Sequence, residues 1–228
     1  MQGTDTIKDS VVKRFAEDIF SDRLKAGDKL PTERDIAEEM QVSRSIVHLA
    51  MEQLASMKLI QMQPRVGNFV CDYRRYGNFE TLMMLAEYGD SFMDQDMTYA
   101  LVELRNAIEG AAMELLSRSG TAEDFACLRS INAEFGRKID ENADISELVA
   151  CNRRFHLEIV NRCGNPFYVM TLNSFSGIRA PWIRCLEHWT PRGMYEQNEK
   201  TADLLESGRG KEAAEYIVSI FEKYKAAN

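Results

Sequence analysis

The chain has 228 residues, a formal net charge of -8 and a hydrophobic share of 45%. This length gives room for two domains, each with its own hydrophobic core. No run of the sequence approaches the roughly 18 uninterrupted apolar residues that a membrane-spanning helix needs, which excludes a membrane protein. The first ten residues, MQGTDTIKDS, lack the basic start and apolar centre of a secretory signal, so a cytoplasmic protein is expected.

The acidic charge is unevenly distributed along the chain. Residues 1–75 contain 12 Lys and Arg against 12 Asp and Glu, whereas residues 76–228 contain 16 against 24. The excess of acid therefore lies in the second part, and a locally basic surface for nucleic acid is compatible with the first. The five cysteines are odd in number and include no C-x-x-C pair, which favours small hydrophobic residues over disulfides or metal ligands.

The first part of the chain opens with two helical patterns. Residues 7–20 place apolar side chains on one helical stripe, and Gly27 and Pro31 then interrupt the pattern. Thr32 is a candidate N-cap, with Asp35 three residues later in the capping-box position. This arrangement predicts a second, short helix.

A third helix and a two-stranded ribbon follow. Ser43 can cap a helix that runs to about Met57. The β-prone stretches LIQMQ and GNFVCDY come next and are separated by a short turn. Three helices followed by a ribbon predict a winged helix-turn-helix domain over residues 1–72. Residues 73–78 are polar, contain a glycine and are predicted to form a linker.

From residue 79 onward the pattern is helical almost everywhere. Helix-breaking residues divide this region: Gly120, a Gly-Asn-Pro turn at 164–166, Pro191 and the glycines at 208 and 210. Apolar residues recur at spacings of three and four between them, in segments near 79–89, 97–117, 121–139, 145–162, 166–188, 194–207 and 210–225. Residues 79–228 are therefore predicted to form an antiparallel all-α bundle of six or seven helices, which makes the protein mainly α.

The segment that begins at Ser43 has the two faces of a DNA recognition helix. Such a helix needs small, hydrogen-bonding or basic side chains toward the groove and apolar side chains toward the domain core. Polar residues occupy one side and apolar residues the other: Ser43, Arg44, Ser45 and His48 against Val47, Ala50, Met51 and Leu54. Arg44 can bind the two acceptors of a guanine edge. The simpler alternative is that Ser43 is only a cap and Arg44 only a solvated charge.

The stretch LPTERDIAEEMQVSRSIVHLAMEQLASMKLIQMQPRVGNFV, residues 30–70, resembles the winged helix of GntR-family bacterial transcription regulators. The resemblance implies binding to double-stranded operator DNA through Arg34, Ser43, Arg44, Ser45, His48, Arg65 and Gly67. Family members commonly carry Arg where this chain has His48. A neutral imidazole offers one donor in place of a charged fork, so the contact at this position is expected to differ.

The helical remainder, with VELRNAIEGAAMELL and NRRFHLEIVNRCGNPF, is similar to the FCD effector domain of the FadR subfamily. In many relatives this bundle holds a divalent metal through one Asp and three His. Here the corresponding positions are Asn152, His156, Asn198 and Phe221. One imidazole with neutral amides is a weak ligand set for zinc or nickel, so neither a metal nor another cofactor is expected. Asn152 and Asn198 are candidates to line a polar, metal-free pocket, and His156 is either a ligand contact or a hydrogen-bonded core histidine.

Arg105, in LVELRNAIEG, is the candidate anion contact, because the family often uses this arginine against a carboxylate. A guanidinium fork binds a carboxylate through two parallel hydrogen bonds. The alternative is an ion pair with Glu109, four residues on, which on a helix surface stabilises by only a few tenths of a kcal/mol. The resemblance therefore implies an effector of carboxylate or acyl type, bound by Arg105, Asn152, His156 and Asn198.

These observations predict a bacterial transcription regulator, interpreted as a repressor of metabolic genes, that is cytoplasmic and associates with the nucleoid when bound to DNA. One short recognition helix per chain reads few base pairs, which predicts a homodimer on a palindromic operator. Two alternatives stay open: an architectural DNA-binding protein without an effector, and a helical-bundle enzyme that uses His156. No nucleophile elbow, phosphate loop or complete metal site accompanies that histidine, so an enzyme is not expected.

Overall fold

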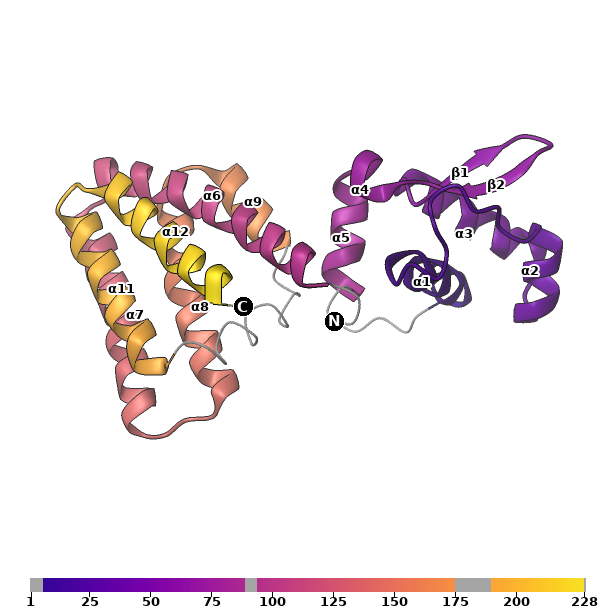
Figure 1. The fold of residues 1–228 in the computed structure, drawn as a ribbon. Helices are drawn as coiled ribbons and strands as arrows, with labels where there is room; N and C mark the ends of the chain where they lie inside the picture. The colour runs from indigo at the N-terminus through magenta and orange to yellow at the C-terminus, as the bar shows by residue number, and fades with distance from the viewer. Residues whose placement is uncertain (1–5, 89–93, 175–189, 228) are drawn as a thin grey trace. The chain divides into compact units, whose positions relative to one another are not determined.

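The computed structural model describes residues 6–88, 94–174 and 190–227, and the chain divides into two compact units, Met1–Met93 and Asp94–Asn228. The first unit contains α1 (Ile7–Phe20), α2 (Glu33–Met40), α3 (Arg44–Ser56), β1 (Ile60–Gln63) and β2 (Gly67–Val70), in the order of a winged helix-turn-helix domain (Figure 1). The predicted fold class of the first domain is confirmed.

Local capping signals fix the starts of the first three helices. Thr6 and Thr32 each form a full capping box, with the aspartate three residues later bonded back to the cap. Gln41 ends α2 in the left-handed region, with φ of 54°, and this permits the tight turn to Ser43 and α3. The core between α1 and α3 consists of fully buried apolar side chains, among them Val11, Ile19, Val47, Ala50, Met51 and Leu54.

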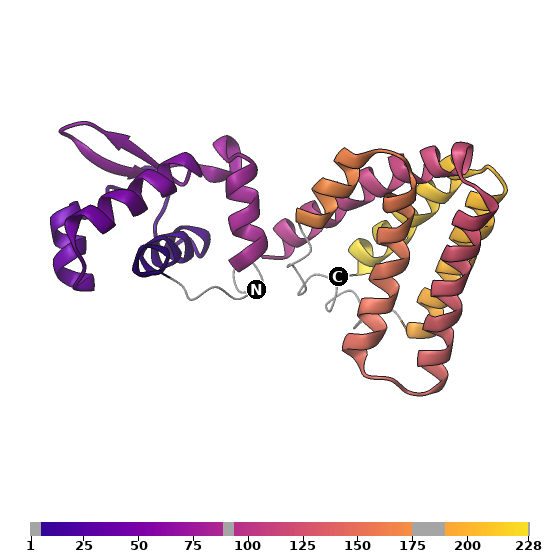
Figure 2. The same ribbon diagram turned by 180° about the vertical axis from the view of Figure 1, so that it is seen from behind.

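The wing is an antiparallel hairpin in which Ile60 pairs with Val70 and Gln63 with Gly67. Figure 2 shows that it projects from the rest of the first unit. Residues 27–30, which the sequence pattern treats only as a break, extend the ribbon on its other edge. Their backbone exchanges hydrogen bonds with β2, including Val70 N to Asp28 O at 2.9 Å and Leu30 N to Asn68 O at 2.9 Å.

The predicted linker at 73–78 is wrong, because these residues form part of the first unit. They contain the helical turn α4 (Tyr73–Tyr76), and the Tyr73 ring packs edge-on against Phe20 with centroids 5.1 Å apart. Asn78 Nδ2 donates to the Ser56 carbonyl at 2.8 Å.

Helix α5 (Phe79–Tyr88) also belongs to the first unit, whereas the sequence pattern assigns it to the bundle. The Ser56 hydroxyl donates to Glu80 at 2.9 Å, and the Thr81 hydroxyl donates to the carbonyl of Met57. These contacts hold α5 against the end of α3. The division between the units therefore lies at 93/94, later than predicted.

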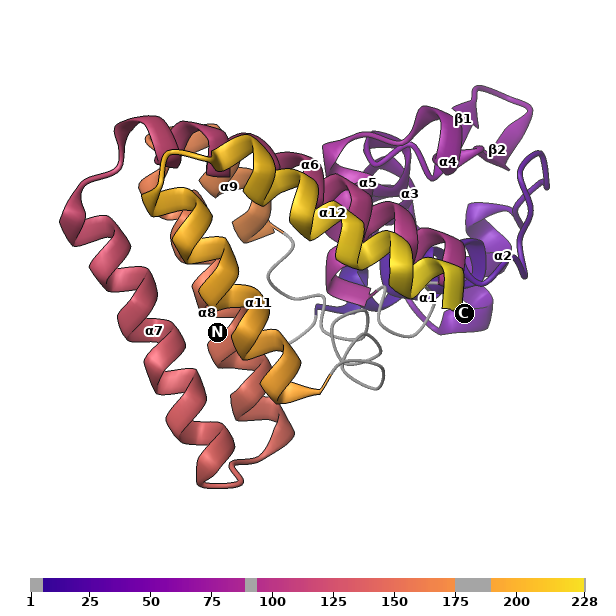
Figure 3. The same cartoon turned by 60° about the vertical axis from the view of Figure 1, so that its left-hand side comes forward.

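The second unit is an all-helical bundle, as predicted (Figure 3). Its described helices are α6 (Gln95–Ser119), α7 (Ala122–Asp140), α8 (Ile145–Arg162), α9 (Pro166–Ser174), α11 (Pro191–Glu206) and α12 (Gly210–Ala227). The helix predicted for 166–188 is described only to Ser174, and the rest of that segment lies outside the described residues. Among the helices that the structure describes, none is long and apolar enough to cross a membrane.

Small residues bring the bundle helices close together. A Cβ added to Gly110 of α6 would lie 3.1 Å from the Ala214 Cβ of α12, and one added to Gly136 of α7 would lie 2.9 Å from the Tyr195 ring of α11. Helix α8 packs on α6 and α7, and it contributes the fully buried Phe155 to the core. This packing brings α6, α8, α11 and α12 around one cavity.

Candidate DNA interface and effector cavity

The start of α3 presents the predicted polar face. Ser43, Arg44 and Ser45 are all exposed, while the opposite apolar face is completely buried. Ser43 Oγ accepts from the Ile46 backbone N–H at 3.3 Å and lies 2.9 Å from Ser45 Oγ. Ser43 is therefore an N-cap, as the simpler alternative held. That role leaves Arg44 at the first exposed position of the helix, where a guanidinium can enter a groove.

His48 lies one turn further along the same exposed face, with 49% of its side chain accessible. Its Nδ1 is 2.8 Å from Glu33 Oε1 on α2, and its Nε2 is 3.6 Å from Glu52 Oε1 on its own helix. The hydrogen bond and charge of Glu33 raise the pKa of His48 above its ordinary value. His48 is thus an imidazole held by an acid from the neighbouring helix.

Arg34 lies on the exposed surface of α2 and pairs with Glu38 at 2.9 Å. Both side chains are largely accessible, and an exposed pair of this kind contributes at most about 1 kcal/mol. Arg34 can therefore exchange Glu38 for a phosphate at little cost. The DNA contact of Arg34 that the resemblance implies stays a prediction.

The tip of the wing carries Arg65, exposed and in the left-handed region with φ of 65°. Gly67, with φ of 135°, has a backbone that other residues rarely adopt, and an added Cβ would lie 2.7 Å from Lys29 Cε. Gly67 therefore shapes the turn that presents Arg65. Lys29 is a basic residue beside the wing that sequence reasoning missed, because its position there depends on the pairing of residues 27–30 with β2.

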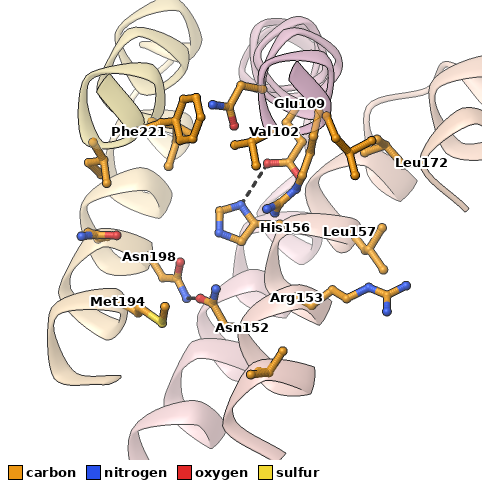
Figure 4. A pocket seen from close by; sticks show the side chains of 17 residues that line it. Val102, Glu109, Asn152, Arg153, His156, Leu157, Leu172, Met194, Asn198 and Phe221 are labelled. Atoms are coloured by element: carbon orange, nitrogen blue, oxygen red, sulfur yellow. Dashed lines mark hydrogen bonds and ion pairs between the residues drawn. The ribbon is translucent and has the colours of Figure 1, made fainter. Parts of the chain in front are cut away.

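The second unit contains a cavity of about 100 Å³ whose lining includes all four predicted effector residues. Figure 4 labels three of them, Asn152, His156 and Asn198. Arg105 comes from α6, Asn152 and His156 from α8, and Asn198 from α11. The lining is otherwise mostly apolar, apart from Glu109, the predicted alternative partner of Arg105, and three polar residues that sequence reasoning did not single out: Asn106, Arg153 and Gln197.

Glu109 occupies the centre of the cavity's polar group. Its side chain is 1% exposed; Arg105 Nε donates to one carboxylate oxygen, and His156 Nδ1 lies 3.1 Å from the other. Burial by itself raises the pKa of Glu109, but the charges and hydrogen bonds of Arg105 and His156 outweigh burial and hold that pKa below its ordinary value.

The ion pair of Arg105 with Glu109 was the alternative to an anion contact, and the structure contains it. Its expected surface location is wrong, because Glu109 is buried and Arg105 has only 19% of its side chain exposed. The sequence indicated Glu109 by its spacing, because it follows Arg105 by one helical turn. Both residues lie on the side of α6 that faces the cavity. His156 is hydrogen-bonded within the bundle and also lines the cavity, and its role as a ligand contact stays a prediction.

The other ligand positions form a neutral corner. Asn198 Nδ2 donates to Asn152 Oδ1 at 2.9 Å, and Phe221 is buried and lines the same cavity as an apolar side chain. The described residues contain no group of three His, Cys, Asp or Glu side chains that could hold a metal ion. An imidazole bonded to a paired carboxylate, two mutually bonded amides and a phenyl ring do not fit zinc or nickel, which take several charged or imidazole donors.

Comparisons with known proteins agree with this architecture. The profile described as "Bacterial regulatory proteins, gntR family" matches residues 7–70, and that described as "FCD domain" matches residues 100–223. The HTH-type transcriptional regulator LutR of Bacillus subtilis is 24% identical over 203 residues, which cover 86% of this chain and 89% of LutR. The galactonate operon transcriptional repressor of Escherichia coli is 24% identical over 158 residues, 69% of this chain and 67% of that protein.

A solved structure shows the same fold. It is described as "Lar controls the expression of the Listeria monocytogenes agr system and mediates virulence", and it aligns with a TM-score of 0.56 at 18% identity. The alignment covers 97% of this chain and 96% of that one.

Proposed function

Because the chain belongs to the GntR family of bacterial regulatory proteins and carries an FCD domain, we propose that it represses metabolic genes and that a small carboxylate in the cavity of the second unit modulates its operator binding. The observation that carries the proposal is the convergence of Arg105, Asn152, His156 and Asn198 on one cavity. As a member of this family the chain is a transcription regulator and not an enzyme.

The cavity favours a small ligand over an acyl thioester. An engineered protein cavity of about 150 Å³ accommodates benzene, so a volume of about 100 Å³ suits a small metabolite and is too small for a coenzyme-sized group. Amide side chains at Asn106, Gln197 and Asn198 suit the hydroxyl groups of a hydroxycarboxylate. Galactonate is one probe, since one relative is named for the galactonate operon, and shorter hydroxycarboxylates match the cavity volume better.

The direct test is a mobility shift on DNA sites selected by the protein, with and without galactonate and a panel of shorter hydroxycarboxylates. A carboxylate that changes the affinity for DNA supports the proposal, whichever direction the change takes. An affinity that stays constant over the whole panel and over metabolite extracts would favour the architectural alternative, in which DNA is bound without an effector.

Carboxylate binding is expected to persist in excess chelator. The donor set around His156 does not fit a transition metal, so the carboxylate is expected to bind Arg105 and the amides directly. Calorimetric titration of untagged protein with and without chelator measures this, and elemental analysis provides the control. A stoichiometric metal that is lost together with binding in His156→Ala would contradict the proposal.

Light scattering at micromolar protein is expected to give twice the chain mass of 26.1 kDa. A single recognition helix of 13 residues contacts too few base pairs to select one site in a genome, and a twofold dimer doubles the contacts on a palindrome. Selected DNA sites should then contain two inverted half-sites. A monomer in solution and on DNA, with a single half-site, would refute the dimer.

A further inference from the structure

His48 is an ionisable side chain at the centre of the DNA-binding face. It follows Arg44 by one turn of α3, and about half of its side chain is exposed. Two carboxylates face it, Glu33 from α2 and Glu52 from its own helix, and Arg44 is the charged residue of the preceding turn. The side chain is therefore accessible to DNA on one side and held by an acid on the other.

The contact with Glu33 determines which ring nitrogen can change its role. An ionised carboxylate only accepts hydrogen bonds, so at 2.8 Å it requires the proton to be on Nδ1 in both the neutral and the charged imidazole. Nε2 is then the atom that gains or loses a proton. The distance of 3.6 Å from Nε2 to Glu52 is too long for a hydrogen bond, so Glu52 does not fix Nε2 in the same way.

Protonation therefore reverses the hydrogen-bonding role of Nε2. With the proton present, Nε2 donates and matches the O6 and N7 acceptors of guanine in the major groove. Without it, Nε2 accepts and matches the amino groups of adenine or cytosine. A permanently charged arginine at this position would favour guanine at every pH.

We propose that His48 contacts a base edge through Nε2 and that its protonation state sets the base preferred at one position of each operator half-site, with Glu33 as the positioning residue that fixes the tautomer. The proposal rests on the DNA binding of the family and is independent of the effector. The pH at which the preference changes is expected to lie above the ordinary range of histidine, because Glu33 raises the pKa of His48. The guanine preference is present below that pH and is lost as the pH rises through it.

The test is selection of binding sites from a random DNA library by the full-length protein, at about pH 5.5 and about pH 8.5, on either side of the histidine range. The wild type should prefer guanine at one half-site position at the lower pH, and adenine or cytosine there at the higher pH. A change of about tenfold in relative affinity is expected, as for one charge-assisted hydrogen bond. All other positions should keep their preferences.

Three variants test whether the change in base preference depends on His48 and on its contact with Glu33. His48→Arg should prefer guanine at both pH values, and Glu33→Gln should lower the pH of the change. Glu39→Gln, at the far end of α2 where Glu39 pairs with Arg14, is the matched control and should behave as the wild type. The side chains of His48, Glu33 and Glu39 are all accessible to solvent at least in part, and thermal unfolding checks that each variant is folded. Identical wild-type preferences at both pH values, or a pH-dependent change that persists in His48→Arg, would overturn the proposal.

Discussion

Arg105→Ala is expected to lower the free energy of unfolding of the second unit by about 3 to 5 kcal/mol, the usual effect of removing one partner from a buried ion pair. Glu109 is 1% exposed, and among the residues that the structure describes its carboxylate would keep only His156 as a partner without Arg105. Urea unfolding of the full chain, followed by a probe in the bundle, measures this loss. The same variant should also lose carboxylate binding, because the proposed anion contact is gone.

Arg118→Ala is the matched control for this prediction. Arg118 lies on the same helix and pairs with Glu114 at 3.1 Å, but 72% of its side chain is exposed. Its removal should change stability by less than about 1 kcal/mol. Equal effects of the two substitutions would show that the Arg105 pair is as well hydrated as a surface pair.

The pH dependence provides a second check on the same ion pair. In the wild type the pKa of Glu109 lies below its ordinary value of 4.5, so the pair stabilises above that pH and its contribution is lost as the pH falls through the lowered pKa. In Arg105→Ala, burial should raise the pKa of Glu109, and protonation relieves the unpaired charge. The stability difference between the two proteins should therefore narrow as the pH falls from the raised pKa of Glu109 in the variant to its lowered pKa in the wild type.

Arg44→Ala is expected to weaken binding to a selected operator by about 1 to 3 kcal/mol and to relax the base preference at one position of each half-site. Arg44 is exposed at the start of α3, where the guanidinium can bind the edge of a guanine. Competition titrations with operators changed at single positions measure both effects.

Arg65→Ala provides the comparison, because a phosphate contact from the wing should behave differently. It is expected to weaken binding to all sequences alike and to reduce the slope of log affinity against log salt by about one. A uniform loss in Arg44→Ala, with the base preference intact, would instead assign Arg44 to the phosphate backbone.

Apart from the helical turn α4, the sequence alone determined the described helices of both units and the two faces of α3. Capping boxes at Thr6 and Thr32, and the N-cap at Ser43, depend on residues within one turn of each other, so their signals are complete in a short stretch of chain. Apolar periodicity likewise gave the buried face of α3, because a helix has a fixed repeat. The remaining positions of α3 then predicted its exposed polar face.

Contacts between distant segments were decided only by the tertiary structure. Residues 27–30 join the ribbon through backbone hydrogen bonds to β2, although their composition is typical of a turn. Asn78 and Thr81 hold the start of α5 against the end of α3, although the composition of residues 73–78 is typical of a linker. Arg105 and Glu109 have the spacing of a surface pair, and packing of α8, α11 and α12 over α6 buries them beside His156. Burial is a property of the assembled bundle. The short sequence pattern could therefore predict the ion pair of Arg105 with Glu109, but not the low-dielectric cavity that strengthens this ion pair.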